Sequence, residues 1–332
     1  MKVLVTGATG FIGGHIIPKL LQKEYQIVFL ARDKQRAEVL RKSFPRISYV
    51  LGDTTRPETL QDLPSDVDYI IHMAAMGHVS ATSQEAYDKF VSVNEGGTRN
   101  LVEHYRDSQS LKRFVHFSST AAMGPAKMPV LNEKSSPNPV TPYQKSKLRS
   151  EKIVQNAFEE YGFPAVILRP CMVYGIGGYG EFYKFCRLMK KGIFPKVGLG
   201  QNLTPLVNAE DVAEAAVLAM ENGHLGEIYL ITSKESIPMD TMRKLIVKSI
   251  GCRAPYIFVP SFAALTGAFV LEKLFNAVGK EPVVTYRNIK STITNRTFDI
   301  TKARSHFGYN PQVSFEKGIQ ETIAWYKGNN KI

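Results

Sequence analysis

Three glycines spaced three residues apart, Gly7, Gly10 and Gly13, follow an apolar run at residues 3–5. A buried strand that passes through such glycines into an apolar helix presents bare backbone N–H groups at the positive end of that helix. A pyrophosphate binds well there, although the spacing G-x-x-G-x-x-G differs from the commoner G-x-G-x-x-G. The segment therefore predicts a dinucleotide-binding turn, with an ordinary tight turn and close helix packing as the alternative.

Apolar runs of strand length alternate with helical patterns along the first half of the chain and again near residue 230. Strands that are apolar on both faces and alternate with helices are typical of a doubly wound parallel sheet, in which ligands bind beyond the carboxyl ends of the strands. The expected strands are residues 2–6, 26–31, 47–51, 68–74, 114–119, 165–170 and 228–232, and the helices between them include residues 36–43, 86–105 and 143–161.

Beyond about residue 170 the alternation becomes irregular, with clusters of Gly and Pro at residues 175–180 and 195–200. We therefore expect an α/β protein whose doubly wound parallel sheet is formed by residues 1–170, with a return at about residues 205–235. A smaller α/β substrate-binding domain, interleaved with the first, is expected to occupy mainly residues 171–332.

The composition limits the classes of function. The chain has 332 residues, of which 44% are hydrophobic, and a formal net charge of +12, so it can bury a large core. Its basic residues form no run interleaved with aromatic residues, which argues against nucleic-acid binding. The three cysteines, Cys171, Cys186 and Cys252, lack the spacing of metal ligands and are typical of a reducing compartment. With no apolar leader before the first strand, we expect a cytoplasmic protein without a metal site.

One stretch in the C-terminal half is unusually apolar. Residues 258–278 hold two charged residues, Glu272 and Lys273, and their uninterrupted apolar part is too short to span a bilayer. We expect a helix that lines a hydrophobic pocket, with ordinary core packing and contact with a membrane surface as alternatives.

The end of the second expected strand distinguishes NAD from NADP. An acid near this position binds the 2′-hydroxyl of the NAD ribose, whereas an arginine accommodates the 2′-phosphate of NADP. Here the strand ends at Ala31 and Arg32 follows, with Lys34 and Arg36 close behind. A guanidinium can bind a phosphate through two hydrogen bonds, so the sequence favours NADP(H). Asp33 leaves NAD(H) open, and Arg32 as a solvated turn residue is the alternative.

Tyr143 and Lys147 stand four residues apart at the start of an expected helix, so both project from one side of it. A neighbouring ammonium favours the phenolate of a tyrosine, whose unperturbed pKa of about 10 makes it a poor base. A hydroxyl at Ser118, Ser119 or Thr120, directly after an expected strand, can hold a substrate oxygen beside the tyrosine. Together with the glycine turn, the pair indicates a proton-transfer site, although such pairs also occur by chance in many helices.

Over nearly its whole length the sequence resembles the extended short-chain dehydrogenase/reductase family, part of the NAD-dependent epimerase/dehydratase superfamily. The resemblance is specific because many motifs occur in one order. They are the segments at residues 6–13 (TGATGFIG), 52–53 (GD), 72–75 (HMAA), 93–94 (VN), 117–119 (FSS), 143–147 (YQKSK), 168–170 (LRP), 173–175 (VYG) and 207–212 (VNAEDV).

The resemblance implies a Rossmann fold and a site with defined roles. Tyr143 would be the catalytic acid or base, Lys147 would lower its pKa and hold the nicotinamide ribose, and Ser119 would polarise the substrate. Asp53 would contact the adenine and Asn94 would be a structural or water-relay residue, although simple loop capping explains both equally well. The cofactor-binding residues implied by position, together with Arg32, are Gly7, Thr9, Gly10, Phe11, Ile12, Gly13, Asp53, Thr54, Met73, Ala74, Ala75, Asn94, Tyr143, Lys147, Pro170 and Val173.

Within the family, the tail is similar to the branch of 3β-hydroxysteroid dehydrogenases and dihydroflavonol reductases. Met172 replaces the asparagine that nucleotide-sugar epimerases and dehydratases usually carry, and their Arg-Pro-Gly-Asp stretch is missing. The tail instead reads NRTFD at residues 295–299, GYNP at residues 308–311 and IAWY at residues 323–326. The resemblance therefore implies reversible hydride transfer between NADP(H) and a hydrophobic secondary alcohol or ketone that is sterol-like, flavonoid-like or long-chain. A cavity walled by residues 76–80 and 258–275 would favour such a substrate.

Two other functions stay open. The first is a nucleotide-sugar epimerase or dehydratase. The second is a noncatalytic NADPH-binding sensor or assembly subunit, which the presence of Tyr143 and Lys147 argues against. The expected partner is a small hydrophobic alcohol or ketone, while peripheral membrane contact and a homodimer formed through a pair of helices from each subunit are left open.

Overall fold

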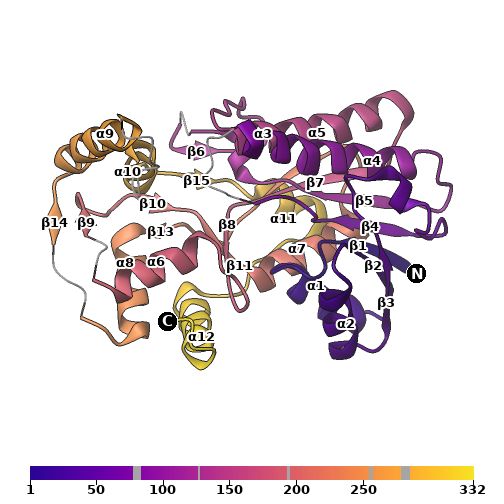
Figure 1. Cartoon of the computed structure of the whole chain (residues 1–332), viewed down its shortest axis with the longest axis horizontal. Coiled ribbons are helices and arrows are strands. Elements are labelled where there is room, and N and C mark those ends of the chain that lie inside the picture. The colour runs from indigo at the N-terminus through magenta and orange to yellow at the C-terminus, as the bar shows by residue number, and fades with distance from the viewer. Residues whose placement is uncertain (78–83, 126–127, 193–194, 254–256, 278–284) are drawn as a thin grey trace.

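The computed structural model describes residues 1–77, 84–125, 128–192, 195–253, 257–277 and 285–332. Its centre is a seven-stranded sheet of parallel strands in the order β12-β7-β5-β4-β1-β2-β3 (Figure 1). Every strand expected in this sheet is present, with ends that differ by at most two residues, so the doubly wound α/β fold is confirmed. The strands are β1 (Lys2–Thr6), β2 (Gln26–Ala31), β3 (Ile47–Leu51), β4 (Tyr69–His72), β5 (Arg113–Phe117), β7 (Ala165–Pro170) and β12 (Ile228–Ile231).

Helices cover both faces of the sheet. Successive side chains of a strand point to opposite faces, so each strand contributes to two cores. Val3 and Val5 of β1 belong to one buried core and Leu4 belongs to the other. The first core is completed by α1 (Gly13–Gln22), α2 (Lys34–Ser43), α7 (Ala209–Asn222) and α11 (Thr301–Phe307), and the second by α4 (Gly97–His104) and α5 (Pro142–Tyr161).

The segment expected as one helix at residues 86–105 has three parts. α3 (Gln84–Phe90) leads into a π-helical segment, η2 (Val91–Gly96), and then into α4. Asn94 is buried in η2, where its side chain accepts a hydrogen bond from the N–H of Met76 (2.8 Å) and donates one to Ser146 (3.0 Å). The prediction of a continuous helix was wrong here, because hydrophobic periodicity does not detect a local change in winding. Such π-helical turns are frequent at functional sites.

Both ends of α5 have residues that stabilise helix termini. At its start, Thr141 accepts a hydrogen bond from the N–H of Gln144 (3.1 Å), and the Gln144 side chain accepts one from the N–H of Thr141 (3.2 Å). Pro142 occupies the first helical position, and Gly162 ends the helix with a φ of 72°. A cap of this kind contributes about 1 kcal/mol, so Tyr143 and Lys147 lie in the first two turns of a firmly anchored helix.

Residues beyond β7 form a third core, and small two-stranded sheets lie outside the seven-stranded sheet. Tyr174, Phe182 and Ile246 are buried among α6 (Glu181–Lys190), α8 (Met239–Ile250) and α12 (Phe315–Gly328). The small sheets pair β8 (Met172–Tyr174) with β11 (Leu206–Asn208), β10 (Leu203–Thr204) with β13 (Ile237–Pro238), β9 (Lys196–Val197) with β14 (Phe258–Val259), and β15 (Thr297–Phe298) with β6 (Val130–Leu131). The remaining elements are η1 (Pro57–Leu60), η3 (Thr120–Met123), α9 (Ser261–Ala277) and α10 (Tyr286–Ile293).

The apolar stretch at residues 258–278 forms β14 and α9, and residue 278 lies outside the described residues. Of the described side chains of α9, that of Ala268 alone is buried. Ordinary core packing, one of the alternatives for this stretch, is therefore wrong. Among the residues that the structure describes, no helix combines the length and apolar character needed to cross a membrane.

Candidate active site

The glycine turn between β1 and α1 brings three backbone segments together. Gly7 has a φ of +78°, and a side chain there would lie 2.9 Å from the backbone nitrogen of Ala74. A side chain at Gly13 would lie 2.2 Å from the carbonyl oxygen of Ala8, so α1 can begin this close to the turn only with glycine. No side chain caps the N-terminus of α1, which leaves this end of the helix suited to a pyrophosphate.

Two arginines lie beside this turn, at the end of β2 and in the first turn of α2. Arg32 is 68% exposed, and its Nη1 lies 3.8 Å from Oδ2 of Asp53. Arg36 donates a hydrogen bond from Nη2 to the carbonyl oxygen of Thr9 (2.8 Å), in the glycine turn itself. Asp33 caps α2 by accepting hydrogen bonds from the N–H groups of residues 35 and 36. Its carboxylate is therefore engaged, while the Arg32 guanidinium is exposed to solvent.

The other expected cofactor residues lie on loops that follow the strands. Asp53 accepts hydrogen bonds from the N–H (2.9 Å) and the hydroxyl (3.0 Å) of Thr55, which is turn capping. The Thr6 hydroxyl contacts Nδ1 of His72 (2.7 Å) and accepts a hydrogen bond from the N–H of Ala74 (3.2 Å), so β1 holds the loop after β4. Thr9, Phe11 and Ile12 lie in the glycine turn, Thr54 after β3, Met73 and Ala75 after β4, Pro170 at the end of β7 and Val173 in β8.

The Ser119 hydroxyl lies close enough to Tyr143 to act on the pKa of its phenol. Tyr143 is half-buried in the first turn of α5, and its ring lies 5.7 Å from that of Phe90, measured between centroids. Burial raises the pKa of Tyr143 above its ordinary value of 10.0, while the neighbouring Ser119 hydroxyl acts in the opposite direction. The phenol therefore holds its proton at neutral pH.

The structure separates the three hydroxyls that follow β5. Ser118 is buried and donates a hydrogen bond to the carboxylate of Glu151. Thr120 is also buried, in η3. Ser119 is half-buried, lies close to the tyrosine, and accepts a hydrogen bond from the N–H of Ala121 (3.1 Å). Of the three residues, Ser119 alone is partly exposed.

Lys147 is buried one turn further along α5. Its ammonium donates a hydrogen bond to the carbonyl oxygen of Phe117, the last residue of β5, at 2.6 Å. Burial lowers the pKa of Lys147 to about 8, against the opposing effect of the Glu151 carboxylate. Burial is the largest influence on the pKa of Tyr143, and the Lys147 ammonium is bonded to the end of β5.

Two residues that sequence reasoning missed support these groups. Glu151, four residues after Lys147, is buried and accepts two hydrogen bonds from Arg169, at 2.8 and 2.6 Å. Arg296 donates to the carbonyl oxygens of Thr120 (3.1 Å) and Gly124 (2.9 Å) and so fixes the loop that carries Ser119. The helical spacing from Lys147 could have indicated Glu151. No sequence signal connects Arg296 to a loop 172 to 176 residues away.

Comparison with known proteins identifies the family. The model of the NAD dependent epimerase/dehydratase family matches residues 3–232. The chain belongs to this family. A dTDP-D-glucose 4,6-dehydratase of Homo sapiens is 27% identical over 340 residues, covering 99% of this chain and 90% of the relative. A 3-beta-hydroxysteroid dehydrogenase of Mycolicibacterium neoaurum is 27% identical over 342 residues, covering 98% of this chain and 91% of the relative.

Solved structures agree with this assignment. The dTDP-glucose 4,6-dehydratase DesIV of Streptomyces venezuelae, a double mutant with NAD and DAU bound, superposes with a TM-score of 0.78 and 25% identity, over 99% of this chain and 98% of that one. The chain spans 47% of a trifunctional relative from Arabidopsis thaliana that includes a UDP-glucose 4,6-dehydratase and is 26% identical over 342 residues. The relatives are dehydratases, epimerases and dehydrogenases, and this chain is an enzyme of the extended short-chain dehydrogenase/reductase superfamily that acts on CH–OH groups.

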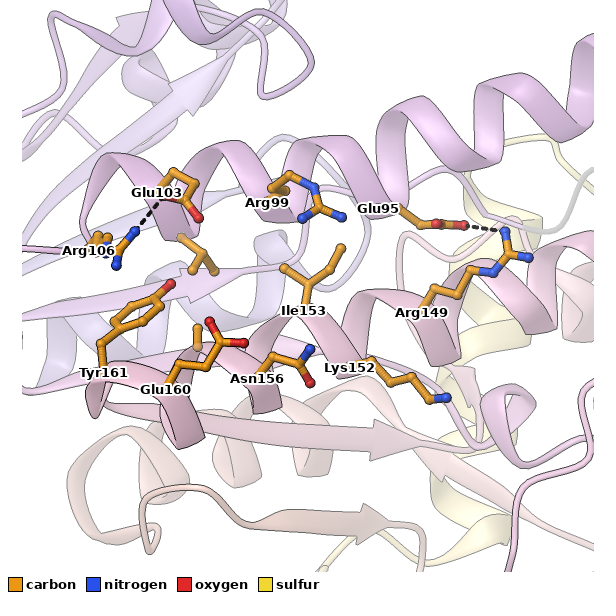
Figure 2. A pocket seen from close by; sticks show the side chains of 12 residues that line it. Glu95, Arg99, Glu103, Arg106, Arg149, Lys152, Ile153, Asn156, Glu160 and Tyr161 are labelled. Carbon is orange, nitrogen blue, oxygen red and sulfur yellow. Dashed lines mark hydrogen bonds and ion pairs between the residues drawn. The ribbon is translucent and has the colours of Figure 1, made fainter.

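This epimerase/dehydratase family member also has a groove of about 390 Å³ between α4 and α5. Figure 2 shows that charged side chains border it, including the ion pairs Glu103–Arg106 (3.7 Å) and Glu95–Arg149 (3.5 Å). None of the expected site residues lines the groove, so it is separate from the active site. Within the described ranges, no cluster of His, Cys, Asp and Glu side chains could hold a metal ion.

Proposed function

We propose that the chain interconverts a secondary alcohol and a ketone on a hydrophobic substrate, with NADP(H) as cofactor. The observation that carries this proposal is the closeness of Tyr143 to Ser119, just beyond the carboxyl end of β5, with Lys147 buried one turn behind the tyrosine. A hydroxyl that binds the substrate oxygen and a phenol that exchanges its proton are what the reaction needs beside the hydride.

The residues around the glycine turn fit a dinucleotide. Gly7 and Gly13 let the turn pack tightly against protein backbone. The N-terminus of α1 that follows has no side-chain cap and suits a pyrophosphate. When bound, the nicotinamide supplies or accepts the hydride. At the adenosine end, Arg32 and Arg36 offer two guanidinium groups while Asp33 caps α2, which favours a cofactor with a 2′-phosphate.

Tyr143 acts as the acid in the direction of ketone reduction. Its raised pKa keeps the proton available at neutral pH, so the phenol donates it to the substrate oxygen as that oxygen gains negative charge. Ser119 holds the same oxygen through its hydroxyl. Lys147, with a pKa of about 8, is charged in most molecules at pH 7 and is assigned to the nicotinamide ribose.

A hydrophobic substrate is supported by two observations. One relative is named as a 3-beta-hydroxysteroid dehydrogenase. In addition, β14 and α9 expose apolar side chains, which include Phe258 and Phe262. The other expected wall of the substrate cavity is formed by residues 76–80, of which residues 78–80 lie outside the described residues.

A nucleotide sugar is the second candidate substrate, because relatives named as dTDP-D-glucose 4,6-dehydratases match nearly the whole chain. Turnover and thermal protection distinguish the two. We expect NADPH oxidation, followed at the nicotinamide absorbance, with at least one sterol, flavonoid or long-chain ketone. If instead a dTDP- or UDP-sugar raises the Tm and no ketone reacts, the nucleotide-sugar assignment replaces this one. NADPH binding without turnover of any substrate would indicate the noncatalytic sensor.

The organisation of the enzyme is part of the proposal. Residues 1–170, with the return at 205–235, would bind the cofactor, and residues 171–332 would mainly bind the substrate. We also propose a homodimer formed through a pair of helices from each subunit. Sedimentation of the full chain measures the assembly state, and a monomer at all concentrations contradicts that assignment.

A further inference from the structure

The helix α9 and the segments beside it expose an unusual density of apolar side chains. Phe262 is 73% exposed and Leu274 is 59% exposed. Monomeric proteins rarely expose a contiguous apolar patch of this kind unless it binds something. We refer to these side chains as the apolar face, which comprises Leu199, Ile257, Phe258, Phe262, Phe269, Val270, Leu271 and Leu274.

Backbone pairing places Leu199 and Phe258 beside the start of α9. β14 pairs with β9, and the N–H of Gly198 donates to the carbonyl oxygen of Val259 at 2.9 Å. Gly198 also lies against Ser261, the first residue of α9, so Leu199 is next to the start of the helix. Figure 1 shows α9 at the end of the molecule that is far from the seven-stranded sheet. The apolar face is therefore an outer surface at one extremity.

The same part of the chain is rich in positive charge. Residues 243–296 contain nine Lys and Arg residues against two Glu residues. Of the nine, Arg243 and Lys244 pair with Asp240, just before this stretch. Of the two acids, Glu272 is half-buried and accepts a hydrogen bond from the N–H of Tyr286 (3.0 Å). Lys273 and Lys290 are exposed, and each ammonium lies within 6 Å of an aromatic ring of α9 or α10. Cations thus border the apolar face.

We propose that the apolar face docks on the surface of an anionic lipid bilayer, with α9 lying in the plane of the interface. Apolar side chains then leave water for the acyl boundary, and the bordering lysines meet anionic headgroups. A second copy of the chain fits less well, because two surfaces of the same strong positive charge would face each other.

The docked surface is connected to the catalytic loop. α10 packs against α9, and shortly after α10 the chain reaches Arg296, which donates to the carbonyl oxygens of the loop behind Ser119. Docking itself does not depend on the reaction. That a hydrophobic substrate enters the site from the bilayer is a consequence that rests on the proposed function.

Co-sedimentation of the full chain with lipid vesicles tests the docking. We expect binding to vesicles that contain phosphatidylglycerol, weakened by added salt, and weaker binding to pure phosphatidylcholine. Phe262→Ser and Leu274→Gln should each lower partitioning by about tenfold, since each removes an apolar side chain from the interface. Val39→Ser, which removes an apolar side chain with 66% exposure from α2, is the matched control and should bind as wild type does.

Three outcomes overturn the proposal. They are no binding to either kind of vesicle, equal binding to both kinds of vesicle, and equal binding of the Phe262→Ser variant and the wild type. A dimer that the Phe262→Ser, Leu274→Gln double variant converts to a monomer would assign the apolar face to a second copy instead. Reduction of a water-soluble ketone is measured separately, so a failure of docking and a failure of the proposed reaction are distinguished.

Discussion

Arg169 and Glu151 form a bidentate ion pair in the interior, with N–O distances of 2.8 and 2.6 Å and side-chain exposures of 3% and 0%. The pair joins β7 to α5, and Ser118 donates a hydrogen bond to the same carboxylate. Lys147 lies one turn before Glu151 on the same helix. The buried Glu151 carboxylate therefore ties α5, the helix that carries Tyr143 and Lys147, to β7 and to the residue directly after β5.

Glu151→Gln should destabilise the protein by about 3–5 kcal/mol, because breaking a buried pair leaves the Arg169 charge uncompensated. Urea unfolding measures this loss. Glu95→Gln is the matched control on a neighbouring element, since Glu95 pairs with a half-exposed Arg149 at 3.5 Å and its loss should cost under about 1 kcal/mol. Equal losses of unfolding free energy in the two variants would show that the buried pair contributes no more to stability than the Glu95–Arg149 pair.

Tyr143→Phe should lower kcat by at least about 10²-fold, because it removes the phenolic proton and leaves the ring packed against Phe90. Binding of NADPH, measured by fluorescence titration, should stay close to wild type. Tyr161→Phe, at the other end of α5, is the control and should keep its turnover. Undiminished ketone reduction by the Tyr143 variant would refute its role as the acid.

Lys147 gives the stability a defined pH dependence. Burial lowers its pKa to about 8 in the folded state, against 10.5 as the ordinary value. Between these values the unfolded state binds more protons, so the free energy of unfolding rises with pH. Below pH 8 both states carry the charge, and burying it costs the folded state about 3 kcal/mol. Relative to Lys147→Met, the wild type should gain about this amount as the pH rises from about 8 to 10.5.

Unfolding of both proteins over this pH range checks the prediction, and other titrating groups cancel in the comparison. Lys145→Met, which changes an exposed lysine of the same helix, serves as the control and should show no such gain. A constant difference between wild type and Lys147→Met would contradict the burial of the charge.

Much of the sheet could be predicted, because its strands are buried on both faces and apolar throughout. Val3, Leu4 and Val5 need no polar side because helices cover both faces. The winding of η2 could not be predicted, because it depends on the buried Asn94 amide and its partner Ser146 on another helix. The exposure of α9 was equally out of reach, since an apolar helix has the same composition whether it is covered or bare.

The candidate site also has parts that could be predicted from the sequence and parts that could not. The glycine turn and the Tyr143–Lys147 spacing are local patterns that sequence displays directly. The choice of Ser119 over Ser118 depends on Glu151 more than thirty residues away, whose carboxylate engages Ser118. The support by Arg296 comes from the far end of the chain. Contacts between distant segments decide which of several equivalent side chains is available to a substrate.

Arg32→Asp should move the cofactor preference from NADP(H) toward NAD(H). A carboxylate there would repel a 2′-phosphate, and it would also lose the 3.8 Å ion pair that Arg32 makes with Asp53. A charge-assisted hydrogen bond contributes about 1.5–3 kcal/mol, so the Kd for NADPH should rise at least about tenfold while that for NADH changes little. Arg46→Asp makes the same charge change at the exposed amino end of β3, the opposite edge of the parallel sheet, and should leave both Kd values unchanged. Parallel titrations of the two variants with NADPH and NADH measure this preference. An unaltered ratio of Kd values in the Arg32→Asp variant would assign the 2′-phosphate to other groups. Arg36, which is bonded to the glycine turn, would then be the next residue to substitute.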